Sequence, residues 1–139
     1  MRRFWLKGEK MIATLAKELY EKSMVLKKYS TVDLMQKSKR GALLCELQND
    51  QQLASLILKE LKNDLSYSSE YYDLALVMCN SLFECVCSLA SKKKNYRQTV
   101  WRYIHGFHNL PRAFLPIESK ARISAAQAMN YYRPYLKTD

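Results

Sequence analysis

The sequence predicts an all-α protein, a compact bundle of five to six helices that forms a single helical domain over residues 1–139. The chain is 48% hydrophobic, which is enough apolar material for one core at this length. It contains three glycines and three prolines, where average usage would give about ten and about seven. Because β-sandwiches and barrels need frequent turns rich in these residues, the scarcity favours helices.

The first predicted helix covers residues 9–28. Its apolar residues recur every three or four positions, the spacing of an amphipathic helix. The stripe consists of four apolar residues and one serine: Ile12, Leu15, Leu19, Ser23 and Leu26. A second helix is expected from a cap at Ser30 or Thr31 to about Gln48, with a kink allowed at Gly41.

A third helix is predicted over residues 50–65, because Asn49 and Asp50 are typical N-terminal caps. One face of this helix would carry Leu53, Leu56, Ile57, Leu61 and Leu65.

The fourth predicted helix, residues 70–91, is apolar on nearly every side. Ser68 or Ser69 would cap it, and Glu70 and Asp73 would place negative charge at the positive end of its dipole. A helix of this kind belongs in the middle of a bundle, or lies half in a core and half in an oligomer interface.

Two further helices complete the bundle. The fifth would begin near Asn95 and end at Gly106, since glycine takes the left-handed C-terminal conformation at no steric cost. The sixth would begin around residues 116–119 and continue until Pro134.

The chain is basic, with a net charge of +10 from 23 lysines and arginines against 13 acidic residues. Such a balance fits either a solvated cationic surface or a site for a polyanion. The four cysteines form no CxxC pair, so we expect reduced thiols and a cytoplasmic location. Charged residues interrupt the apolar N-terminal stretch, so no export signal is expected. No run approaches the roughly 20 apolar residues that are needed to span a bilayer, so no transmembrane segment is expected.

Arg102 and His108 are separated by five residues, within a stretch that holds both histidines of the chain. This R-x(4–6)-H spacing resembles the catalytic motif of the HEPN superfamily, small all-helical proteins that include many metal-independent ribonucleases. The resemblance implies that histidine moves the 2′-hydroxyl proton and that arginine holds the phosphate. Tyr103 stands where family members commonly carry a polar residue, and Gly106 interrupts the expected helix.

No metal site or cofactor is predicted. Residues 98–117 contain no carboxylate that could join the two histidines. Cys85 and Cys87 would point roughly 200° apart on a helix. The sequence also lacks GxSxG and Gly-rich phosphate-binding patterns.

Two sets of residues are candidates for binding. The first is near the C-terminus and consists of Tyr132, Arg133 and Tyr135. The second set follows the fourth predicted helix. Trp101 could stack on a base there, and so could Tyr103. A cationic group lies nearby and consists of Lys92, Lys93, Lys94 and Arg97.

The leading functional hypothesis is a non-catalytic regulatory or accessory protein that binds a protein partner or associates with itself. The alternatives are the ribonuclease activity of Arg102 and His108, and non-specific nucleic-acid binding. A helix-turn-helix formed by residues 31–65 is a further alternative, with its turn near Asn49.

Overall fold

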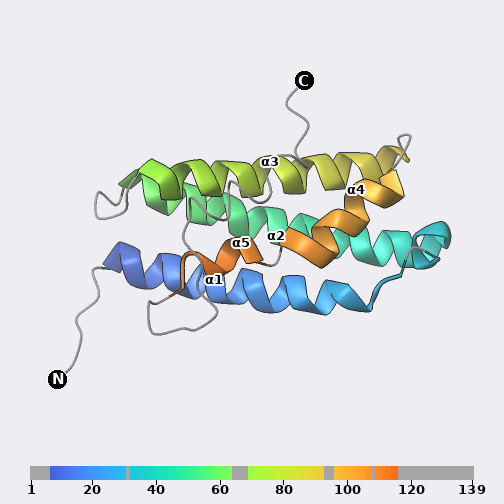
Figure 1. Cartoon of the computed structure of the whole chain (residues 1–139), viewed down its shortest axis with the longest axis horizontal. Helices are drawn as coiled ribbons and strands as arrows, with labels where there is room; N and C mark the ends of the chain where they lie inside the picture. The colour runs from blue at the N-terminus through green and yellow to red at the C-terminus, as the bar shows by residue number, and fades with distance from the viewer. Residues whose placement is uncertain (1–6, 31, 64–68, 93–95, 108, 116–139) are drawn as a thin grey trace.

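The computed structural model describes residues 7–30, 32–63, 69–92, 96–107 and 109–115. Every regular element in these ranges is helical, which confirms the predicted all-α class. Three helices are long: α1 (Lys7–Val25), α2 (Lys37–Asn63) and α3 (Ser69–Ser91). Two short helices, α4 (Tyr96–Arg102) and α5 (Asn109–Arg112), flank a π-helical turn at Tyr103–Phe107 (Figure 1). The predicted sixth helix lies outside the described residues.

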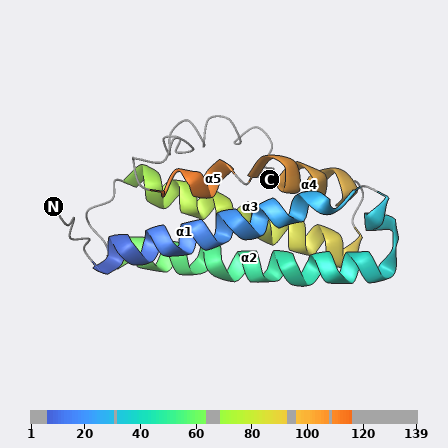
Figure 2. The ribbon, with the colours of Figure 1, turned by 90° about the horizontal axis from the view of Figure 1, so that it is seen from below.

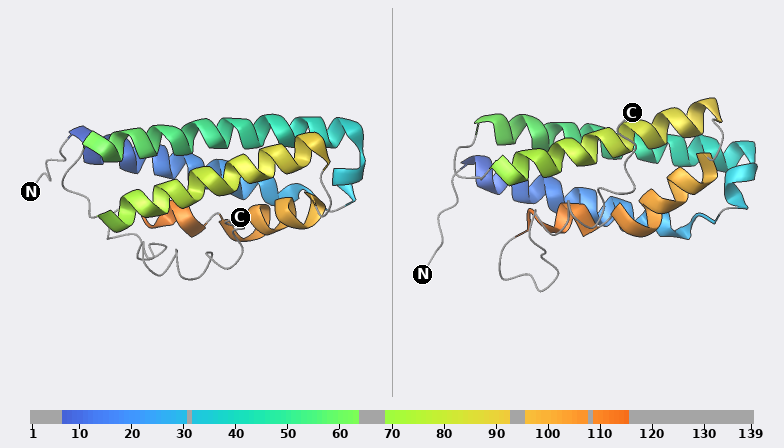
Figure 3. Two further views of the ribbon diagram at one scale, coloured as in Figure 1. Left: turned by 90° about the horizontal axis from the view of Figure 1, so that it is seen from above. Right: turned by 45° about the horizontal axis from the view of Figure 1, so that its top comes forward.

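The three long helices follow one another as antiparallel neighbours, with α1 packed on α2 and α2 packed on α3 (Figure 2). The shorter elements α4, the π-turn and α5 form a fourth side that covers the space between α3 and α1. Figure 3 shows α2 and α3 side by side along most of their length.

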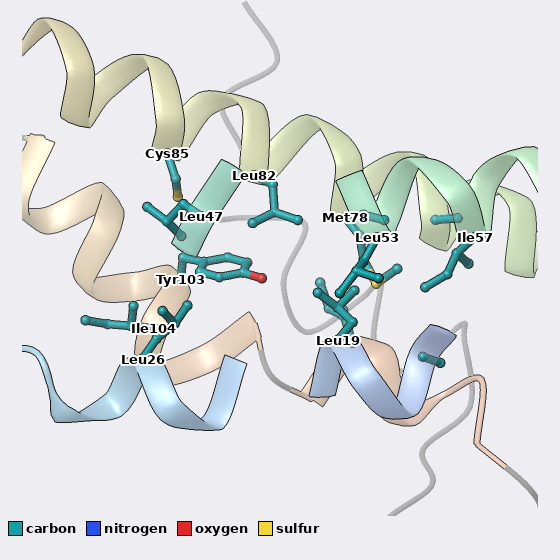
Figure 4. Packing of buried hydrophobic residues seen from close by; sticks show 14 of the residues in the cluster. Leu19, Leu26, Leu47, Leu53, Ile57, Met78, Leu82, Cys85, Tyr103 and Ile104 are labelled. Atoms are coloured by element: carbon teal, nitrogen blue, oxygen red, sulfur yellow. The ribbon is translucent and has the colours of Figure 1, made fainter. Parts of the chain in front are cut away.

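One hydrophobic core connects all four sides of the bundle. Figure 4 shows Met78, Leu82 and Cys85 pointing from α3 into the bundle, where Tyr103 enters from the π-turn. The predicted stripe of α1 is confirmed, with Leu15 half-buried and four members buried: Ile12, Leu19, Ser23 and Leu26.

The predicted boundary between a second and a third helix is wrong. Helix α2 continues without a break through Asn49 and Asp50, and Asp50 is buried on the core side rather than capping a helix end. The helix-turn-helix alternative is therefore excluded, because residues 37–63 contain no turn. Leu56, expected on the apolar face, is 45% exposed.

The predicted helix cap at Ser30 is wrong, because Ser30 forms hydrogen bonds with Asp33 in the connection before the long helix. Its hydroxyl accepts a hydrogen bond from the Asp33 amide at 3.2 Å, and the Asp33 carboxylate accepts one from the Ser30 amide at 2.9 Å. This reciprocal pair has the hydrogen-bond pattern of a capping box and lies just before the 3₁₀ turn Asp33–Met35, whose own N-cap residue is Val32. The hydrogen bond from the Ser30 amide lowers the pKa of Asp33. The long helix begins only at Lys37.

The left-handed terminus predicted at Gly106 is wrong, although the helical segment ends one residue later, at Phe107. The chain continues through Gly106 in the π-helical turn, and no glycine in the described ranges has a positive φ. The left-handed helix terminus occurs instead at Lys92, whose φ is 49° directly after α3.

Helix α3 has the mean hydropathy, 1.7, and the length that would allow it to cross a membrane. These two properties are also typical of a core helix, and 44% of its most apolar window is buried inside the bundle. The absence of a transmembrane segment stays a prediction.

Candidate functional site

The face of α3 that points away from the core is apolar and open to solvent in the part of the chain that the structure describes. Phe83 is 57% exposed and Leu76 is 40% exposed. They belong to a row of residues whose positions differ alternately by four and by three. We call this row the outer face of α3, and it consists of Leu76, Asn80, Phe83, Cys87 and Ala90. Asn80 and Ala90 are exposed, and Cys87 is half-buried.

The opposite side of the same helix enters the core. This inner face consists of Leu74, Met78, Leu82, Cys85 and Leu89, all buried. Helices whose apolar residues alternate at spacings of three and four pair with other helices along that row. Helix α3 therefore carries two rows of residues at this spacing, of which the inner one is occupied by its own bundle.

Charged groups are sparse along the middle of α3 and gather at its ends. Between Asp73 and Lys92 the sequence carries a single charged residue, Glu84. Glu84 accepts a hydrogen bond from the buried Ser88 hydroxyl at 3.4 Å. Glu70 and Asp73 are exposed in the first turns, and Lys92 is exposed just after the last turn.

A second surface is formed by α4 and the π-turn. Arg97, Trp101 and His105 are all exposed and follow one another at intervals of four residues, so they share one side of the helical segment. The rings of Trp101 and His105 are in contact, with centroids 4.5 Å apart and planes inclined by 37°. A cationic group therefore lies one turn from an exposed aromatic pair.

Several predicted site residues lie outside the described part of the chain. These are Tyr132, Arg133 and Tyr135 of the C-terminal candidate, with Lys93, Lys94 and His108. Arg102 ends α4, although its side chain is not described. The catalytic pair of Arg102 and His108 therefore stays a prediction.

The suggestion that Tyr103 stacks on a base is wrong, because Tyr103 is buried in the core with 3% exposure. Burial and the nearby charge of Asp50 raise its pKa. Trp101, in contrast, is 45% exposed and remains available for stacking.

Asp50 is a buried carboxyl group that was not predicted from the sequence. Its side chain is 1% exposed, and its Oδ2 atom has no hydrogen-bond partner among the described residues. Desolvation raises its pKa to about 7, opposed by Lys22 on α1 and reinforced by Glu46 one turn earlier on α2. Asp50 lies three residues after Leu47 and three before Leu53, a spacing that places it on the core stripe of a continuous helix.

The four cysteines are free and differ in their surroundings. Cys85 is buried, its pKa is raised by desolvation, and its Sγ lies 3.8 Å from the carbonyl oxygen of Thr99. Cys79 is half-buried with a pKa also raised by burial. Cys45 is exposed on α2, while Cys87 belongs to the outer face of α3. Within the described ranges, no three His, Cys, Asp or Glu side chains are close enough to hold a metal ion.

Comparisons of the chain with protein-family models, with curated proteins and with solved structures find no match.

Proposed function

We propose that the protein is a non-catalytic helical-bundle protein that acts by binding, and that it associates with itself through the outer face of α3. The observation that carries the proposal is the exposure of Phe83 and Leu76 on a helix face opposite the core. The proposal treats residues 1–139 as one domain of five to six helices in a reducing, cytoplasmic setting.

The free-energy gain comes from removing apolar surface from water. Complete burial of a leucine or phenylalanine side chain contributes roughly 1.5–3 kcal/mol. Phe83 and Leu76 are partly covered already, so each gains part of that amount. In a symmetric pair every contact occurs twice, so both side chains contribute from each copy.

Sedimentation equilibrium tests self-association directly. We expect the natural chain to form dimers at tens of micromolar and the Phe83→Lys variant to remain monomeric. Met35→Lys is a matched control, because this substitution adds the same charge as Phe83→Lys. Met35 is 62% exposed and lies on the connection between α1 and α2. A natural chain that stays monomeric, or two variants that weaken association equally, would contradict the proposal.

A second candidate function is the binding of single-stranded nucleic acid on the surface of Arg97, Trp101 and His105. The observation that favours it is an exposed aromatic pair in ring contact, one helical turn from a cation. Bases stack on such rings with little regard to sequence, and each contributes roughly 1–3 kcal/mol.

Fluorescence anisotropy with a labelled uridine oligonucleotide tests this function. Trp101→Ala should lower the affinity by a factor of five to about a hundred, and the affinity of the natural chain should fall with added salt as counterions are released. Phe83→Ala is the control and should bind like the natural chain. A Trp101→Ala variant that binds the oligonucleotide as tightly as the natural chain would contradict nucleic-acid binding on this surface.

A further inference from the structure

We infer that the connection between α1 and α2 is a docking surface for an anionic lipid bilayer. Two exposed apolar side chains of this connection, Val32 and Met35, enter the interface of the bilayer, and we call them the apolar tip. Lys37 and Lys39 contact the lipid phosphates. The inference goes beyond the proposed self-association and does not depend on it, because the apolar tip and the outer face of α3 are on different elements.

The apolar tip is the most exposed apolar feature of the residues that the structure describes. Val32 is 64% exposed and Met35 is 62% exposed, the two highest values among the large apolar side chains there. The Met35 amide donates a hydrogen bond to the Val32 carbonyl oxygen at 3.0 Å. Residues three apart in a 3₁₀ turn lie on the same side of it, so the two side chains project into water together. Their removal from water favours docking.

Hydrogen bonds from two helices hold the turn in this orientation. The side chain of Leu34, between the two tip residues, is fully buried in the core. Its carbonyl oxygen accepts a hydrogen bond from Arg40 Nη1 on α2 at 3.1 Å and another from the Tyr96 hydroxyl on α4 at 3.2 Å. Because the turn is fixed with Leu34 inward, the apolar tip is held outward and needs little ordering in order to dock.

The residues around the apolar tip are basic. Residues 26–40 contain five lysines and arginines and one acidic residue. Lys37 and Lys39 are exposed in the first turn of α2, directly after the 3₁₀ turn. The pKa of Asp33 is lowered by the hydrogen bond from the Ser30 amide and also by the charge of Lys39, so Lys39 lies beside the turn that carries the tip.

The stability of α2 does not account for these lysines. Acidic side chains are the ones that stabilise the first turn of a helix, and α2 has none there. Lysines next to exposed apolar side chains are instead the combination that binds anionic membranes, where the charges attract the lipid headgroups and the apolar groups enter the interface.

The residue types of the connection fit lipid better than nucleic acid. Valine and methionine have no aromatic face on which a base could stack. Tyr29 is the only aromatic residue between positions 26 and 40, and it is buried. The connection also lies at one end of the elongated bundle (Figures 1 and 2), where a flat bilayer can meet it.

Sedimentation with phosphatidylcholine–phosphatidylglycerol vesicles at physiological salt tests the role of the lysines. The natural chain should bind these vesicles and should not bind vesicles of phosphatidylcholine alone. The double variant Lys37→Gln, Lys39→Gln should bind about 25-fold more weakly, since each lysine near an anionic surface strengthens binding about fivefold.

A matched control removes the same charge from the other end of α2. The double variant Lys59→Gln, Lys62→Gln changes two exposed positions about 30 Å away along the helix, well beyond the screening length of about 8 Å. Its affinity for the vesicles should stay within about twofold of that of the natural chain.

A neutral substitution tests the apolar tip. The double variant Val32→Ser, Met35→Ser removes apolar surface without changing the charge and should weaken binding to the same vesicles about tenfold. Leu56→Ser is the control, because Leu56 is 45% exposed on α2 away from the connection, and it should bind like the natural chain. Circular dichroism melting verifies that each variant is folded.

Three results would overturn the inference: no binding of the natural chain to anionic vesicles, equal losses in the two lysine double variants, or full binding by the variant of the apolar tip. Binding through Lys37 and Lys39 to a uridine oligonucleotide but not to vesicles would assign the surface to nucleic acid and would also overturn it. A natural chain that binds vesicles through the apolar tip but remains monomeric would contradict the proposed self-association and leave this inference standing.

Discussion

The two faces of α3 have similar composition and different surroundings. The inner face contributes Leu82, fully buried, and Met78, 2% exposed, to the core. The outer face offers Phe83 and Leu76, which are 57% and 40% exposed. A helix that is apolar on both sides is expected where both sides are covered. Among the residues that the structure describes, α3 therefore has one apolar face covered by the bundle and a second whose largest apolar side chains are open to solvent.

The two faces of α3 should affect two different free energies, that of unfolding and that of association. Substitutions on the inner face should change the free energy of unfolding, since the contacts there hold the four sides of the bundle together. Substitutions on the outer face should change association and leave the unfolding of the monomer almost unaffected.

The largest expected effect is on the inner face. Leu82→Ala removes a side chain with 0% exposure and should lower the free energy of unfolding by about 2–5 kcal/mol, because the cavity is filled only in part. Urea unfolding of dilute monomer measures this change. Leu76→Ala on the outer face is the matched control and should cost less than about 1 kcal/mol. Equal losses in the two variants would show that the faces do not differ.

The buried carboxyl group on α2 should make the stability of the core depend on pH. Because burial raises the pKa of Asp50 to about 7, the folded state retains a proton that the unfolded chain releases above about pH 4. The contribution of Asp50 to the free energy of unfolding therefore falls as the pH rises from about 4 to about 7, and it stays constant above pH 7.

Asp50→Asn removes this titration while keeping the shape of the protonated side chain. It should raise the free energy of unfolding at pH 8 by about 2–4 kcal/mol and have little effect at pH 4. Urea unfolding at several pH values measures the difference. A variant less stable than the natural chain at pH 8 would show instead that Lys22 stabilises the ionised carboxylate.

The smallest expected effect is on the free energy of unfolding, at the end of α3. Lys92 adopts a left-handed conformation with φ of 49°, which costs a non-glycine residue about 1 kcal/mol. Lys92→Gly should therefore raise the free energy of unfolding by roughly 0.5–1 kcal/mol. Thermal melting of dilute protein measures this change, and a Lys92→Gly variant that melts at a lower temperature than the natural chain would contradict it.

The sequence predicted the elements whose signals agree with their packing. The expected range 70–91 matches Ser69–Ser91 within one residue, because a serine cap and acidic first turn precede a long apolar run. The stripe of α1 was predicted for a similar reason: Ile12, Leu19 and Leu26 are spaced for a single buried face.

The errors arose where a local signal competes with tertiary contacts. Asn49 and Asp50 form a typical cap, yet the leucines on both sides of Asp50 continue one core stripe and keep α2 helical. Gly106 is a typical stop, yet the chain passes through it in a π-turn that includes the buried Tyr103 and Ile104.

The candidate site was predicted in outline only. An apolar fourth helix suggested an oligomer interface, but the residues of its open face depend on how α2, α4 and the π-turn pack around it. Trp101 and Arg97 were predicted and are exposed on one surface, whereas the contribution of His105 depends on the course of the π-turn.

Alkylation of the natural cysteines tests the self-association of the outer face most directly. Cys87 belongs to that face, while Cys45 is exposed on α2 and provides an internal reference. If α3 pairs with a second copy, mass spectrometry should show the labelling rate of Cys87 falling as the protein concentration rises through the dimerisation range, while that of Cys45 stays constant. A labelling rate of Cys87 that does not depend on concentration would contradict the account.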